Sequence, residues 1–242
     1  MTSLRPLLAL ALLAGCHTPP AHTPTVTAGP PAHVGCPVAP DTEGECSYES
    51  TGLPALTTDG KLVLHAEQDE DGGRGAPNFR VVARRVADDS VAGELLVEPA
   101  VDERIPAADR DANLDKANAA LALLPATALT LYPRDCEQDG GEPGCRDKAQ
   151  DAPLTASVGP LVVAYGEPKL RVTRDGKVLL EQDMPAWSAP PQGSGEDACT
   201  NPAHLGGVWA DVGRGVLLVK ISYSGTDSCW EPSSSYHVVK LP

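Results

Sequence analysis

The sequence is poor in aromatic residues and in positive charge. It has one Phe, five Tyr and three Trp among 242 residues, and 19 Lys and Arg stand against 33 Asp and Glu, a formal net charge of −14. An acidic surface repels nucleic-acid phosphates and anionic lipid headgroups, and no block of Lys and Arg offsets this repulsion locally. We therefore expect no nucleic-acid partner.

Recognised catalytic motifs are also absent. The nearest approach to G-x-S-x-G is Gly193-Ser194-Gly195, in a stretch rich in Pro and Gly, and there is no H-E-x-x-H and no Walker loop. His65, His204 and His237 are isolated in the sequence, which is typical of packed or hydrogen-bonded histidines. The sequence thus predicts no cofactor, and it assigns no activity.

No apolar run is long enough to cross a membrane as a helix, which takes roughly 20 residues. The run from Leu7 to Ala14 follows a single base, Arg5, and precedes Gly15 and Cys16. This arrangement is typical of a secretory signal. We expect residues 1–15 to be a signal peptide that is removed on export.

Leu13-Ala14-Gly15-Cys16 resembles the lipobox of bacterial lipoproteins. The resemblance implies that Cys16 receives a diacylglycerol, becomes the new N-terminus and is acylated. Several acyl chains, at roughly 0.8 kcal/mol per buried CH₂, suffice for stable anchoring. An aspartate after the lipidated cysteine favours the inner membrane in families whose sorting is understood. His17 stands there instead, which favours the outer membrane.

The expected mature chain begins with a tether. Residues 16–35 are mostly His, Thr, Pro, Ala and Gly and have too little apolar surface to fold. Residues 36–242 then form a globular domain, with an alternative division into two subdomains near residue 150. With Arg5 removed, 18 bases against 33 acids give a net charge of −15.

Six cysteines follow Cys16, and an even number in an exported chain indicates disulfides. Fifteen connectivities are allowed. Proximity in the sequence favours three local pairs. These are Cys36 with Cys46, Cys136 with Cys145, and Cys199 with Cys229. No C-x-x-C spacing supports the metal-binding alternative.

The periodicity of the globular domain is mostly that of β-strands. Short apolar or alternating runs separated by turn residues predict a mainly β fold of antiparallel sheets and meanders, with a hairpin at Asp175-Gly176 and a three-stranded meander over residues 208–241. Residues 108–124 differ, because apolar side chains recur there at helical spacing, at Leu114, Ala117, Leu121 and Leu124. We expect one main amphipathic helix lying on a sheet.

A second resemblance covers most of residues 55–242. Asp59-Gly60 leads into a strand, an acidic Gly-rich turn follows at 68–75, and an Ala-rich helix precedes a closing meander of residues 215–223 and 236–241. This order resembles a family of predicted secreted bacterial proteins of unknown function. The chain departs from that family's pattern at residues 75–78 and in its added cysteines. The family has no assigned activity, so the resemblance implies no functional residue.

Two groups of residues are candidate ligand contacts. Asp69 and Asp71 lie in the acidic turn and have oxygens suited to Ca²⁺, although an EF-hand loop would require Glu where Arg80 stands. The aromatic candidates for stacking on a sugar or peptide are Trp187, Trp209 and Trp230. A solvated acidic turn and a packed core are the competing readings of these residues.

The sequence favours a non-enzymatic binding or accessory lipoprotein of the cell envelope, with a protein or polysaccharide partner. One alternative is an envelope hydrolase whose carboxylates, such as Asp69, Asp71 and Asp211, are dispersed along the chain. The other is a metal-binding lipoprotein.

Overall fold

The structure is a computed structural model, which describes residues 30–37, 46–68, 78–99, 105–137, 145, 152–166, 168–184, 203–222 and 234–242. Across these ranges the chain is mainly β with one helix, so the predicted fold class is confirmed. The elements are β1 His33–Gly35, β2 Glu49–Thr51, β3 Ala55–Thr57, β4 Leu62–Gln68, β5 Phe79–Arg85, β6 Val91–Glu98, α1 Ala107–Ala122, β7 Ala126–Ala128, β8 Thr130–Tyr132, β9 Leu154–Val158, β10 Leu161–Gly166, β11 Lys169–Arg174, β12 Lys177–Asp183, β13 His204–Asp211, β14 Val216–Ser222 and β15 Ser234–Lys240.

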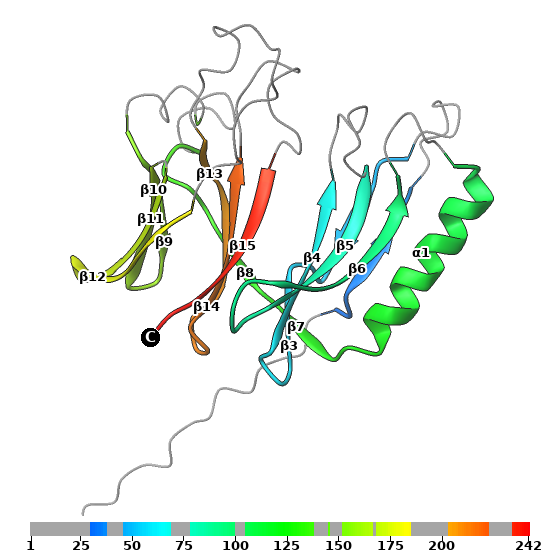
Figure 1. The fold of residues 1–242 in the computed structure, drawn as a ribbon, viewed down its shortest axis with the longest axis horizontal. Helices are drawn as coiled ribbons and strands as arrows, with labels where there is room; N and C mark the ends of the chain where they lie inside the picture. The colour runs from blue at the N-terminus through cyan, green and yellow to red at the C-terminus, as the bar shows by residue number, and fades with distance from the viewer. Residues whose placement is uncertain are drawn as a thin grey trace, which may run out of the picture.

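Three antiparallel sheets and the helix lie in successive layers (Figure 1). The first sheet has the strand order β6-β5-β4-β3-β7, the central sheet β15-β14-β13-β8, and the third sheet β12-β11-β10-β9. β1 and β2 form a separate pair. The central sheet takes β8 from before residue 150 and its other three strands from after it, so it joins the two parts of the chain.

The central sheet is buried on both faces, and β14 shows this most clearly. Val216 and Leu218 contribute to the apolar cluster shared with the first sheet, whereas Leu217 and Val219 contribute to the cluster shared with the third sheet. Successive side chains of a strand point to opposite faces, so both faces of β14 require apolar residues. This accounts for the continuous apolar run in the sequence.

α1 covers the outer face of the first sheet (Figure 1). Leu114, Ala117 and Leu121 are buried there, as their helical spacing predicted. The Asn118 amide also donates to the carbonyl of Val34 and accepts from its N–H, both at 2.9 Å. Both main-chain groups of Val34 are therefore hydrogen-bonded to α1. Val34 is also fully buried, so residues 33–35 pack with the globular domain, and the predicted end of the tether at residue 35 is too late by at least these three residues.

The predicted hairpin and meander are both confirmed. β11 and β12 are joined at Asp175 and Gly176, whose φ angles of 51° and 75° are those of a primed turn, which follows the twist of the two strands. β13, β14 and β15 pair in sequence as an antiparallel meander.

Two of the three predicted disulfides lie among the described residues and are confirmed. Cys36 bonds to Cys46 and Cys136 bonds to Cys145, with Cα–Cα distances of 5.3 and 4.8 Å. Cys199 and Cys229 lie outside the described residues, as does Cys16. No helix in the described ranges is long and apolar enough to cross a membrane.

Candidate functional site

A pocket of about 300 Å³ lies where β2 and β4 approach the central sheet. It is lined by Tyr48, Ser50, Ala66, Gln68, Phe79, Lys220 and Tyr236. These residues come from three separate parts of the chain. We call this feature the pocket.

The end of β4 forms the pocket because its neighbour β3 is short. β3 pairs with β4 only at Val63 and Leu64, so β4 continues past its partner to Gln68. Ala66 and Gln68 lie on this extension and both line the pocket. A strand that is longer than its neighbour has an unpaired edge beyond the neighbour's end. The pocket lies beside this unpaired edge of β4.

Aromatic rings form part of the pocket wall. The rings of Tyr48 and Phe79 are stacked, with centroids 4.2 Å apart and planes 2° apart. The Tyr48 hydroxyl donates to a carboxylate oxygen of Glu98, and burial together with this carboxylate raises the pKa of Tyr48. Burial, and secondarily the charge of Glu67, raises the pKa of Tyr236. Both phenols therefore stay neutral at physiological pH.

Lys220 brings positive charge to the pocket. Its Nζ lies 5.8 Å from the ring centroid of Tyr236, within cation–π range. Tyr236 also packs against the apolar cluster between the first and central sheets. The pocket thus combines one cation, aromatic faces, and the neutral polar groups of Ser50 and Gln68.

A polar network lies on the face of the first sheet that is turned toward the central sheet. Arg80 donates through Nε to Glu67 at 2.6 Å and through Nη1 to Glu94 at 3.1 Å. His65 lies beside this network and is fully buried, with its ring centroid 4.6 Å from that of Tyr236. Neither ring nitrogen of His65 has a hydrogen-bond partner among the described residues.

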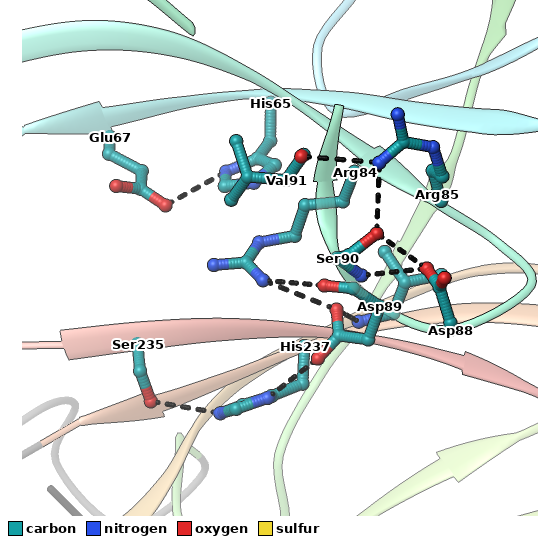
Figure 2. Close-up of polar contacts among 11 residues, drawn as sticks. His65, Glu67, Arg84, Arg85, Asp88, Asp89, Ser90, Val91, Ser235 and His237 are labelled. Carbon is teal, nitrogen blue, oxygen red and sulfur yellow. Dashed lines mark hydrogen bonds and ion pairs between the residues drawn. The ribbon is translucent and has the colours of Figure 1, made fainter. Parts of the chain in front are cut away.

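Burial lowers the pKa of His65 to about 3, and the positive charges of Arg84 and Arg80 act in the same direction. The ring is therefore neutral at physiological pH. The contact of its Nδ1 with Glu67 at 3.7 Å (Figure 2) is for that reason not an ion pair under those conditions.

A second polar group joins β15 to the turn between β5 and β6. Figure 2 shows Ser235, His237 and Asp89 in one chain of hydrogen bonds. His237 Nδ1 lies 2.9 Å from Asp89 Oδ2, and its Nε2 lies 3.2 Å from Ser235 Oγ. We call these three residues the relay. Tyr236 lies between two of its members, so the relay and the pocket occupy opposite faces of β15.

Of the residues that the sequence proposed as candidates, the structure describes Trp209 and Asp211, both on β13. The Trp209 ring packs over Gly207 and against the cluster between the first and central sheets, near Tyr236. Asp211 accepts a hydrogen bond from the Arg214 N–H at 2.9 Å in the turn after β13. Trp187, Trp230, Asp69 and Asp71 lie outside the described residues.

Sequence reasoning missed both the pocket and the relay. Ser235 and His237 are two apart on a strand, a spacing that places them on one face and could have indicated a pair. Asp89 is 148 positions from His237, and no local signal joins them. Tyr48, Gln68 and Lys220 likewise come together only through the packing of the sheets.

A metal centre finds no support in the part of the chain that the structure describes. No group of three or more His, Cys, Asp or Glu residues there is arranged to hold an ion.

Comparison of the chain with protein-family models, with curated proteins and with solved structures gives no match.

Proposed function

We propose that the protein is a lipid-anchored binding module of the bacterial cell envelope, and that the pocket holds a segment of an envelope polysaccharide. In this proposal residues 1–15 direct export, Cys16 carries the lipid, and the part of residues 16–35 that precedes β1 tethers the domain to the outer membrane. The ligand then reaches the pocket from the envelope.

The observation that carries the proposal is the composition of the pocket. Its volume of about 300 Å³ is at the lower end of the range for ligand sites, enough for one or two sugar rings. A sugar presents an apolar C–H face and a rim of hydroxyl groups. Tyr48 and Tyr236 offer aromatic surface to the face, and Ser50 and Gln68 offer donors and acceptors to the rim.

Charge supports the same class of ligand. The whole chain carries a net charge of −14, yet the pocket contains Lys220. A polysaccharide that bears carboxylates would pair with this ammonium group. A neutral polysaccharide would use only the rings and the amide, so Lys220 provides a way to tell the two apart.

Binding of fractionated envelope polysaccharides by the full chain in detergent micelles tests the proposal. Gln68→Ala should weaken binding of the polysaccharide at least about tenfold, the equivalent of one good hydrogen bond. Lys220→Met should weaken binding of a fraction that bears carboxylates by a similar factor and leave binding of a neutral fraction unchanged. Gln182→Ala and Lys177→Met, on β12 of the third sheet, are matched controls and should leave binding unchanged.

Two outcomes would contradict the proposal. One is that no polysaccharide fraction binds the wild-type chain. The other is that the Gln182 and Lys177 variants weaken binding as much as the pocket variants do, since binding would then not depend on the pocket.

A further inference from the structure

We propose that Ser235 is a nucleophilic serine, activated by His237 and oriented through Asp89, and that it reacts with acyl esters. The proposal rests on the relay alone and is independent of the pocket, which opens on the other face of β15. It also differs from a hydrolase built on dispersed carboxylates, because the attacking group here is a hydroxyl.

The atoms that meet in the relay are those that a serine nucleophile requires. A carboxylate only accepts hydrogen bonds, so His237 Nδ1 must carry the proton that it shares with Asp89 Oδ2 at 2.9 Å. In the neutral ring this leaves Nε2 as an acceptor. The Ser235 hydroxyl, 3.2 Å away, then donates to Nε2. Asp89 thereby selects the tautomer in which His237 can act as a base toward Ser235.

Asp89 is fixed by contacts from two strands besides its contact with His237. Its Oδ1 accepts from the Val238 N–H at 2.6 Å, and Arg84 Nη1 donates to its main-chain carbonyl at 2.9 Å. Its φ angle is 59°, in the left-handed region, which Asp tolerates in turns. Contacts from two strands thus fix the carboxylate that accepts from His237.

The Ser235 hydroxyl is not needed to link β15 to the turn that contains Asp89. Val238 and Arg84 already join Asp89 to β15 and to β5, and both contacts would persist without a serine at position 235. The side chains of His237 and Asp89 are 25% and 27% exposed, so the relay is in contact with solvent. Asp89 and His237 thus form a hydrogen-bonded acid–base pair that is partly exposed to solvent and contacts the Ser235 hydroxyl. This is the arrangement expected of a reactive serine.

The reaction proceeds in two steps. Ser235 Oγ attacks the ester carbonyl carbon and gives its proton to His237 Nε2; the C–O bond to the leaving group then breaks, and His237 protonates the departing alkoxide. Water next attacks the acyl-serine and gives a proton to His237, which returns it to Ser235 Oγ. The products are one carboxylic acid and one alcohol, and no external oxidant or metal takes part.

Covalent labelling of the full chain with a fluorophosphonate, followed by peptide mapping, tests the proposal. Ser235 Oγ should bond to phosphorus, with loss of fluoride. His237→Gln should slow labelling by at least about 100-fold, the usual contribution of a general base. Asp89→Asn, which keeps a side chain tolerant of the positive φ, should slow it at least about tenfold through the rate constant of the bond-forming step and not through affinity for the probe.

Two further measurements separate chemistry from structure. Release of p-nitrophenolate from p-nitrophenyl acetate should show a burst in the wild-type chain and none in Ser235→Ala. Ser157→Ala, at an exposed position on β9, is the matched control and should keep both the labelling and the burst. Far-UV circular dichroism checks that each variant is folded.

The wild-type chain is a test that needs no variant. If the probe leaves the Ser235 peptide unlabelled, Ser235 is not a nucleophile and the proposal is overturned. It is equally overturned if folded His237→Gln is labelled as fast as the wild type, or if the burst persists in Ser235→Ala.

Discussion

His65 should make the stability of the protein depend on pH. It is fully buried between Arg80, Arg84 and Tyr236, and burial lowers its pKa to about 3 from an ordinary value of 6.5. Between these two values the unfolded chain binds a proton at His65 that the folded chain does not. Protonation therefore favours unfolding, and stability falls as the pH falls.

The size of the effect follows from the pKa difference. Above pH 6.5 the His65 ring is neutral in both states, and the free energy of unfolding has its full value. As the pH drops from 6.5 toward 3, proton binding to the unfolded chain progressively lowers that free energy. At about pH 5, roughly 1.5 units below the unfolded value, the loss is about 2 kcal/mol, since each unit is worth about 1.4 kcal/mol. That is a large part of the 5–15 kcal/mol by which native proteins are usually stable.

Urea denaturation at about pH 7 and about pH 5 measures this difference. The variant His65→Leu removes the titrating ring and keeps the site apolar, so its stability should fall by about 2 kcal/mol less than that of the wild type over this interval. His33→Asn, at an exposed position on β1, is the control and should behave as the wild type does. Equal losses in the wild type and in His65→Leu would refute the reasoning.

Three further predictions concern stability and are checked by urea denaturation at neutral pH. Gly207→Ala places a Cβ 2.7 Å from the Trp209 ring and should cost about 1–3 kcal/mol, whereas no loss would mean that the ring moves freely. Leu218→Ala leaves a cavity between two sheets and should cost about 2–5 kcal/mol, and a smaller loss would place the site outside the core. Replacing Cys36 and Cys46 together by Ser should lower the free energy of unfolding by roughly 2.5–3 kcal/mol, given a 10-residue separation. Under reducing conditions the wild type loses the bond too, so a variant that is still less stable by the same amount would argue against the bond as the cause.

Local signals in the sequence were enough for much of the fold. Helical spacing of Leu114, Ala117 and Leu121 correctly predicted the helix and its buried face. The Asp175-Gly176 turn correctly predicted a hairpin, because its positive φ angles require such residues. These elements are determined by neighbours within a few positions, and periodicity therefore finds them.

The short strands and the layer order could not be obtained in this way. β3 and β7 have three residues each, too few for a period to be recognised, yet they complete the first sheet. The apolar run of β14 indicated burial without indicating which layers cover it. Such features depend on contacts between distant parts of the chain.

The candidate sites depend on the same distant contacts. The pocket requires β3 to end before β4 does and Tyr236 to lie opposite β4. The relay requires the turn at Asp89 to reach β15. His237 was correctly placed on a strand, but its role is set by a partner that the sequence does not indicate.

A photoreactive amino acid placed at Gln68 of the full-length chain in living cells tests the central claim most directly. We predict crosslinks to envelope polysaccharide from position 68 and none from the matched position Gln182, with the crosslinks lost when Cys16→Ala removes the proposed anchor. Crosslinks to polypeptide alone, or equal crosslinking from both positions, would contradict the assignment of the pocket as a polysaccharide site.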